Sequence, residues 1–237
     1  MVKIPARYNG PDTSGNGGWV SGLVAGQLNS GGPAAVMLKL PPPLDVELEW
    51  DADEHHVYLK HPDGSTIASA TQGAFTGETP GAPSIENATT GMENYAGHEA
   101  HPFNRCFTCG TQRGDGDGLR IFSGPYDSGT TAATWTPHTA FDDGTGHVAP
   151  EVSWAALDCP GGWAANVGDE PAVLGSMTAH IIRRPRTGEP CLVRGVLMAS
   201  SGRKRHTATA LYTRGGELLG RAEHVWIQID PAKFTGG

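Results

Sequence analysis

One carboxylate stands out within a run of small and apolar residues. Residues 150–165 read PEVSWAALDCPGGWAA, a pattern that predicts a buried helix, and Asp158 is its only acid beyond the first turn. Burying an ionised carboxylate without partners is costly, so Asp158 needs a structural partner or a chemical role. Desolvation raises the pKa of a carboxyl group, which favours a general base or nucleophile facing a cleft. The structural alternative is an Asp that pairs with an arginine or caps the backbone near a helix break at Pro160.

A second segment able to do chemistry reads NGGWVSGLVAGQL, residues 16–28, and predicts a helix that starts at two glycines. The N-terminus of a helix offers unpaired backbone N–H groups and the positive end of the helix dipole. Such groups can stabilise the oxyanion that develops when a carbonyl carbon is attacked. Gly17 and Gly18 are therefore candidates to contact a substrate carbonyl. The alternative is a tight helix cap with packing glycines.

These two helices belong to halves of the chain that contain the same elements in the same order. In residues 1–78 the helix is followed by two strands and by a hairpin at Asp63-Gly64. Residues 79–104 carry Pro, Gly, Asn and Thr and lack apolar periodicity, which predicts a linker.

The second half, residues 105–231, opens with a hairpin and continues with the Asp158 helix, two strands and a hairpin at Gly215-Gly216. The last residues, 232–237, are expected to form a tail. One helix followed by three or four antiparallel strands, twice over, predicts an α+β fold in which a sheet wraps round a helix.

Three motifs resemble the acyl-CoA thioesterase family of the hotdog fold, in its tandem (double) form. CFTCGTQRGDGDGLRIF, residues 106–122, is similar to the entry signature of many single-domain members. APEVSWAALDCPGGWAA, residues 149–165, is similar to the family helix. YNGPDTSGNGGWVSGLVAG, residues 8–26, is similar to the loop and HGG helix start, with Asn16 in place of the His. The resemblance implies two tandem hotdog units, each an antiparallel sheet wrapped round a central helix.

The resemblance also implies hydrolysis of acyl-CoA or acyl-carrier thioesters, with no cofactor and no covalent Ser or Cys nucleophile of the hydrolase-triad kind. The N–H of the first glycine would polarise the carbonyl, and an acid on the helix of the opposing unit would activate water or attack directly. By position, Asn9 would orient the water or the carbonyl, unless it only starts an Asn-Gly turn. Asn16 would belong to the same site, and Ser176 or Thr178 would hydrogen-bond the acid.

In the family the acid follows the first glycine by eight residues, and this spacing gives each half one defect. Counting from Gly17 leads to Ala25, so the first half has the glycine backbone but no acid. Counting from Pro150 leads to Asp158, so the second half has the acid but a proline, which has no N–H to donate. Glu151 adds a negative charge at that helix start. We therefore expect one complete site, with Gly17 facing Asp158 across the interface between the units.

Aromatic and basic residues are candidates to bind the rest of the substrate. Trp19 and Trp163 could floor an acyl pocket, with Gly18 beside it. The basic clusters GRKRH (residues 202–206) and RRPR (residues 183–186) either bind the phosphates of coenzyme A or are ordinary charges at exposed strand ends. The first cluster supplies three candidates for phosphate binding, which are Arg203, Lys204 and Arg205.

The cysteines are too few and too scattered for a disulfide framework, so reduced thiols are expected at Cys106, Cys109, Cys159 and Cys191. The spacing of His98, His101, Cys106 and Cys109 is compatible with zinc. Because the resemblance explains the two cysteines of CFTCG without a metal, no metal is expected.

Composition and charge limit the partners. The chain has 237 residues and a formal net charge of −8, whereas nucleic-acid binding needs a basic face. The first residues contain no apolar segment of a secretory signal, and no stretch has the length of a membrane span. We expect a cytoplasmic protein without nucleic-acid or membrane partners, whose double hotdog can pair into a homodimer.

Two other functions fit part of this pattern. A non-catalytic acyl-CoA binding protein or sensor is an alternative, because one of the two sites is already incomplete. A hotdog hydratase or dehydratase would need a His paired with the acid at the helix. His147 and His180 lie beyond the two ends of the Asp158 helix, so this third function is the least favoured.

Overall fold

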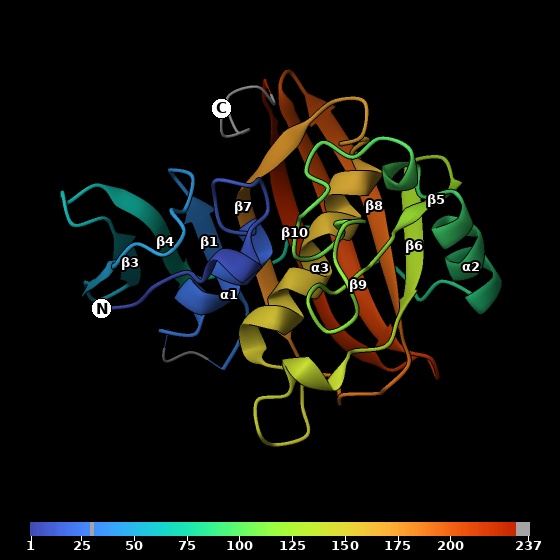
Figure 1. Ribbon diagram of the computed structural model, residues 1–237, viewed down its shortest axis with the longest axis horizontal. Helices are drawn as coiled ribbons and strands as arrows, with labels where there is room; N and C mark the ends of the chain where they lie inside the picture. The colour runs from blue at the N-terminus through green and yellow to red at the C-terminus, as the bar shows by residue number, and fades with distance from the viewer. Residues whose placement is uncertain (29–30, 231–237) are drawn as a thin grey trace.

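The computed structural model describes residues 1–28 and 31–230. Within this part of the chain, ten strands form one antiparallel sheet in the order β2-β3-β4-β1-β7-β10-β9-β8-β6-β5. Two helices, α1 (Gly17–Ala25) and α3 (Pro150–Ala164), pack against each other on one face of this sheet (Figure 1). The predicted tail, residues 232–237, lies outside the described residues.

The remaining elements follow the order expected from the sequence. The strands of the N-terminal half are β1 (Ala34–Leu38), β2 (Glu49–Ala52), β3 (His56–Lys60) and β4 (Thr66–Gln72). Those of the C-terminal half are β5 (Gly124–Asp127), β6 (Thr130–Trp135), β7 (Ala172–Ile181), β8 (Cys191–Ser201), β9 (Lys204–Thr213) and β10 (Leu218–Gln228). Short 3-10 helices are η1 (Ala6–Tyr8), η2 (Ala96–His98) and η3 (Thr139–Phe141).

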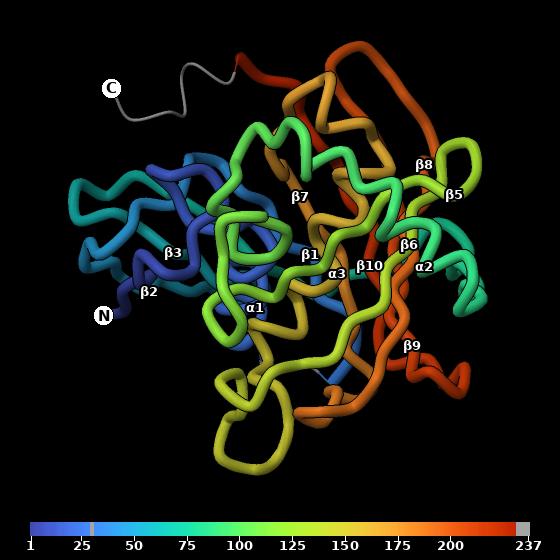
Figure 2. The backbone as a smooth tube through the Cα atoms, turned by 45° about the vertical axis from the view of Figure 1, so that its right-hand side comes forward, coloured from blue at the N-terminus to red at the C-terminus, as the bar shows by residue number. Residues whose placement is uncertain are grey.

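Both halves have the same topology after their central helix. The first strand after the helix pairs with the fourth, β1 with β4 and β7 with β10. β1 and β7 also pair with each other, from Ala34 opposite Ala179 to Met37 opposite Ser176. This pairing joins the two halves side by side into one sheet (Figure 2). The C-terminal half adds the β5–β6 hairpin, and β6 pairs with β8.

Glycines allow the two central helices to approach closely. A Cβ atom at Gly18 would lie 2.5 Å from Cβ of Asp158, and one at Gly22 would lie 2.8 Å from Cα of Glu151. These distances are shorter than any van der Waals contact, so no larger residue fits without moving a helix. The contact is surrounded by fully buried apolar side chains of the two helices: Val20, Val24, Ala155, Ala156 and Leu157.

Residues 79–104 contain a helix where the sequence predicts only a linker. This helix, α2 (Ile85–Glu93), starts at Ser84, whose hydroxyl accepts a hydrogen bond from the N–H of Asn87, and it packs against β5 and β6. Ala88 and Gly91 are its only buried residues. The helix is short and polar overall, and its apolar stripe of Ile85, Ala88 and Met92 was not recognised in the sequence.

The helix break expected at Pro160 is absent, because α3 continues through this residue to Ala164. A proline removes one helical hydrogen bond, which would leave buried backbone groups without partners. Threonine hydroxyls from neighbouring segments donate to other carbonyls of α3 on this stretch, those of Ala155, Leu157 and Pro160, and so tie the helix to its surroundings.

Among the helices of the described residues, none combines the length and the apolar character that crossing a membrane requires.

Candidate active site

A cavity opens where the start of α1 meets the middle of α3 and the strands β7 and β10. Its volume is about 230 Å³ and its wall is mostly apolar. Asp158 and Gly17, from opposite halves of the chain, both line it. The apolar wall also comes from both halves and includes Leu38, Pro41, Phe103, Leu174, Trp226 and Ile227.

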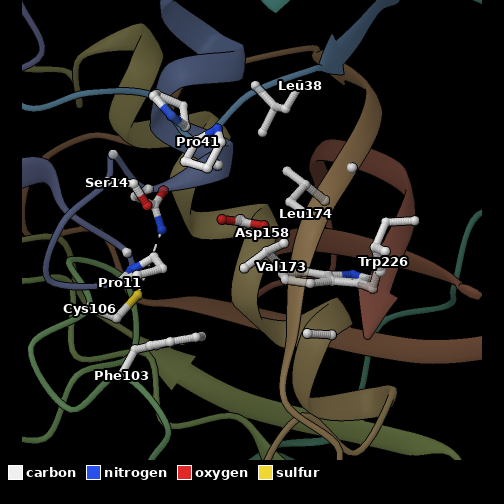
Figure 3. A pocket seen from close by; sticks show the side chains of 18 of the residues that line it. Pro11, Ser14, Leu38, Pro41, Phe103, Cys106, Asp158, Val173, Leu174 and Trp226 are labelled. Carbon is white, nitrogen blue, oxygen red and sulfur yellow. Dashed lines mark hydrogen bonds between the residues drawn. The ribbon is translucent and has the colours of Figure 1, made fainter. Parts of the chain in front are cut away.

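The Asp158 carboxylate lies in the middle of this wall, between Cys106 on one side and Trp226 on the other (Figure 3). Asp158 is only 2% exposed. The backbone N–H of Gly18 donates to Oδ2 at 2.8 Å. The other oxygen, Oδ1, is buried and has no hydrogen-bond partner among the described residues. One oxygen is therefore fixed by the opposite half, and the other is buried without a partner in a residue that lines the cavity.

The surroundings of Asp158 favour a proton acceptor near neutral pH. Burial raises the pKa of Asp158 to about 7, and the charge of Cys106 acts in the same direction. The Gly18 N–H and the Asn16 amide oppose this rise. No arginine pairs with Asp158 within residues 1–28 and 31–230. The expected alternative, a structural Asp–Arg pair, is therefore not found there.

The start of α1 presents backbone N–H groups to the same cavity. Asn16 is the N-cap, and its Oδ1 accepts a hydrogen bond from the N–H of Trp19 at 2.9 Å. The N–H of Gly18 is held by Asp158. Gly17 is the first helical residue, and the N–H groups of the first turn have no acceptor within their own helix. This N–H can stabilise negative charge on a carbonyl oxygen placed in the cavity.

A second cavity, of about 250 Å³, lies at the other end of the contact between α1 and α3. It is lined by Ala25 and Pro150. By the spacing described above, Ala25 occupies the acid position of the first half, and Pro150 occupies the first-glycine position of the second half. Among the described residues of its lining there is no carboxylate. The proline lacks an N–H, so this second cavity has neither of the two groups that meet at Asp158.

Solved structures with a similar fold come from proteins described as thioesterases. A candidate thioesterase of Novosphingobium aromaticivorans matches with a TM-score of 0.62 at 11% identity, over 97% of this chain and 94% of its own. A tesB protein of Mycobacterium avium subspecies paratuberculosis matches with a TM-score of 0.56 at 12% identity, over 91% and 87%. This chain has the hotdog fold of these thioesterase structures. A candidate thioesterase II of Thermobifida fusca matches equally well, with a TM-score of 0.56 at 13% identity over 97% and 91%.

Comparison with family models and with curated proteins finds no match. A thioesterase superfamily protein shares 24% identity over 47% of this chain, but the chain spans only about half of that protein, 55%, with a TM-score of 0.43. At these identities the hotdog fold is the extent of the similarity.

Ser176 and Thr178, the expected hydrogen-bond partners of the acid, lie elsewhere in the hotdog sheet. Both line a separate hollow with Glu223 instead of the Asp158 cavity. The cause is a β-bulge at Gly175, which has no partner in the register of β7 with β10. Side chains alternate along a strand, and an extra residue reverses the faces that follow it. Leu174 therefore points into the cavity, whereas Ser176 does not.

Asn9 lies next to the cavity of the hotdog site but does not line it. Its amide nitrogen donates to the carbonyls of Gly10 and Pro11, and its oxygen accepts a hydrogen bond from Arg113. All of its polar atoms are thus engaged in shaping the loop, which supplies Gly10 and Pro11 to the wall. The expected contact of Asn9 with water or the carbonyl is not supported by this position.

The tryptophan in the cavity wall is Trp226, which the sequence analysis missed. Trp19 stacks on Tyr8 with ring centroids 4.3 Å apart, and Trp163 packs against Tyr95 at 4.5 Å. Neither of them lines the cavity. The predicted floor residues were therefore wrong. Buried and half-buried residues alternate along β10 in the structure, which places Trp226 on the inner face, whereas Val225, Trp226 and Ile227 form a continuous apolar run in the sequence.

The basic residues of the first cluster lie at the β8–β9 turn, beside the cavity but outside its lining. Arg203 donates to the carbonyl of Gln228, and Arg205 forms an ion pair with Glu170 at 2.6 Å. Lys204 lies opposite Ile227 in the β9–β10 register, and Ile227 lines the cavity. The position is adjacent to the site, and phosphate binding by Arg203, Lys204 and Arg205 stays a prediction.

The second basic cluster is neutralised by acidic partners. Arg183 pairs with both Glu189 and Glu217, and Arg184 pairs with Asp143. Carboxylates that already hold these guanidinium groups compete with any phosphate. The RRPR segment is therefore a structural ion-pair cluster at a strand end.

Proposed function

We propose that this protein hydrolyses acyl-CoA or acyl-carrier thioesters at a single site between two tandem hotdog units. The observation that carries the proposal is the Asp158 carboxylate in the cavity wall, one oxygen of which is held by Gly18 of the opposite half while the other has no hydrogen-bond partner among the described residues. The topology shared by the two halves supports the tandem arrangement. The fold shared with structures described as thioesterases supports the reaction class.

Asp158 acts on the water or on the thioester itself. As a general base, its Oδ1 accepts a proton from a water molecule while the water oxygen attacks the carbonyl carbon. The tetrahedral intermediate then expels the thiolate, which takes the proton from Asp158. As a nucleophile, Asp158 attacks the carbonyl carbon, the C–S bond breaks and the thiolate leaves, and a mixed anhydride forms. Water then hydrolyses the anhydride, which releases the carboxylic acid, regenerates the Asp158 carboxylate and supplies the proton that the thiolate takes up. Both routes use the same oxygen, because Gly18 fixes the other one.

Gly17 stabilises the charge that develops on the carbonyl oxygen. Its N–H stands at the start of α1 in the wall of the cavity, where the helix dipole also favours negative charge. An amide fixed in a desolvated site needs no reorganisation during the reaction, which is the basis of its effect on rate. Asn16 keeps this helix start in place by capping it.

The cavity favours hydrolysis over hydration of a double bond. A hotdog hydratase or dehydratase would need a histidine beside the acid, and the described lining of the cavity contains none. A sensor is the alternative, and it would bind the same thioesters without hydrolysing them. Such binding is compatible with the cavity, because the apolar wall does not depend on the chemistry of Asp158.

The test is thiol release from a panel of acyl-CoAs of graded length, with binding measured on the same samples by calorimetry. We expect saturable release of coenzyme A from at least one chain length at which binding is also seen. Saturable binding with no release above the uncatalysed rate across the panel would leave a sensor as the function. A single turnover in H₂¹⁸O, followed by mass analysis of the residue 158 peptide, then separates the two routes, because only the anhydride route can place ¹⁸O in the carboxylate.

A further inference from the structure

Three cysteine thiols converge beside the cavity. The Sγ atoms of Cys106, Cys109 and Cys159 lie within 4.8 Å of one another, and all three residues are buried. The Sγ atoms of Cys106 and Cys159 are 3.7 Å apart. In a tetrahedral site with Zn–S bonds of about 2.3 Å, two sulfurs lie about 3.8 Å apart. The observed separation therefore matches that of two ligands on one ion.

The local backbone is organised around these sulfurs. Cys106 and Cys109 stand in a Cys-x-x-Cys-Gly turn, in which the N–H of Gly110 donates to the carbonyl of Cys106 at 2.8 Å. A Cβ atom at residue 110 would lie 2.5 Å from that carbonyl oxygen, so the turn requires glycine. Two cysteines separated by two residues form the usual half of a structural zinc site. Cys159 is added by α3, fifty residues further along the chain.

Hydrogen-bond donors are aimed at the sulfurs. The Asn16 amide donates to Sγ of Cys106 at 3.7 Å, and Nε2 of His101 lies 3.3 Å from Sγ of Cys109. Such donors beside metal ligands orient them and adjust their basicity.

His101 is a donor to this cluster and not one of its ligands. Its Nδ1 accepts a hydrogen bond from the N–H of Phe103 at 2.9 Å, so the proton of a neutral ring is on Nε2. A protonated ring nitrogen has no lone pair for a metal. His98 is not among the residues whose donor atoms converge here, and its ring packs against Tyr95 and Phe122. The zinc set read from the sequence, two histidines and two cysteines, differs from the cluster that the fold assembles.

We propose that Cys106, Cys109 and Cys159 bind one zinc ion as thiolates, with a fourth, exchangeable ligand on the side of the cavity. Cys106 and Cys159 line the cavity, which gives a small ligand access to the ion, whereas Cys109 lies behind them. Three thiolates select zinc or copper(I) over harder ions. This inference rests on the positions of the sulfurs and does not depend on the proposed hydrolysis.

The test is the zinc content of the full chain, purified under reducing conditions, stripped with a chelator, reloaded with zinc sulfate and desalted. We expect one zinc per chain for the wild type and for Cys191→Ser, a buried free cysteine outside the cluster. Cys109→Ser removes one ligand without altering the cavity wall. We expect it to weaken zinc binding at least roughly 100-fold in competition with a chromophoric chelator.

Cobalt(II) provides a readout on the wild type that does not depend on how the variants fold. Thiolate coordination gives sulfur-to-cobalt charge-transfer absorption together with the intense visible bands of a tetrahedral site. Wild-type protein with less than a tenth of an equivalent of zinc and no such absorption would overturn the proposal. So would equal losses of zinc in Cys109→Ser and Cys191→Ser, copper in place of zinc, or a wild-type mass two hydrogens lower from a Cys106–Cys159 disulfide.

Discussion

Asp158 is positioned by a residue that is remote in sequence, and this arrangement determines which of its atoms can react. The Gly18 N–H fixes Oδ2. Only glycine fits at position 18, because a Cβ atom there would overlap Asp158. The Asp158 carboxylate and the Gly18 N–H that orients it thus meet at one contact between α3 and α1. In the proposed reaction, the reactive oxygen is Oδ1, which has no hydrogen-bond partner among the described residues.

The N–H of Gly17 can be tested by comparing two substitutions at this residue. Gly17→Ala and Gly17→Pro both add a Cβ atom, which would lie 2.8 Å from Cβ of Leu174. Only proline also removes the N–H, and both the first helical position and the extended Asn16 before it accept proline. We expect kcat of Gly17→Pro to be about 10²–10³-fold below that of Gly17→Ala. Equal kcat values for the two variants would rule out an oxyanion role for this N–H.

Trp226 limits the length of the acyl chain in our account. Trp226→Phe enlarges the cavity, whereas Trp163→Phe makes the same change outside the wall. We expect Trp226→Phe to raise the ratio of kcat/KM for the longer over the shorter of two neighbouring acyl-CoAs about tenfold, since one methylene in an apolar pocket is worth about 1–3 kcal/mol. The ratio should not move in Trp163→Phe. A similar change in both variants would point to a general loss of packing.

At the scale of elements, the contact between α1 and α3 builds the site. Gly22 provides the second close approach, opposite Glu151 and Trp154. We expect Gly22→Ala to lower the free energy of unfolding in urea by about 1–3 kcal/mol, because the added methyl forces the helices apart. Gly26→Ala is the matched control, because its added methyl would meet only carbonyl oxygens of α1 itself, at 3.3 and 3.6 Å, and no atom of α3. A control as unstable as Gly22→Ala would show that helix packing is not the cause.

The helices and strands also explain which site residues could be predicted from the sequence. The fixed spacing from a helix start to an acid lies within one helix, so it correctly predicted that Asp158 and Gly17 share a cavity. The position of Ser176 could not be predicted, because the bulge at Gly175 reverses the face of the sheet on which the side chains of β7 lie after Leu174. A bulge depends on the pairing with β10, which no local pattern records. The third sulfur of the cysteine cluster was missed for the same reason, since Cys159 meets Cys106 only through tertiary packing.

At the scale of the whole molecule, our proposal is that two halves with complementary defects form one site. The order of their elements was predictable, because hairpin turns and apolar helices have local signals. The union of β1 with β7 into one sheet was not, because it pairs residues about 140 positions apart. The polar helix α2 was missed because its stability comes from packing on β5 and β6 and not from its own pattern.

The central claim is that a single carboxylate on α3 performs the reaction for the whole molecule. The most direct measurement is kcat for thiol release by Asp158→Asn beside Glu151→Gln, which removes one negative charge from the start of the same helix. Loss of a general base costs about 10²–10⁴ in rate, so we expect kcat of Asp158→Asn to fall at least 100-fold while its thermal unfolding stays cooperative. Glu151→Gln should keep nearly the wild-type kcat. A folded Asp158→Asn variant with near wild-type turnover would contradict the account.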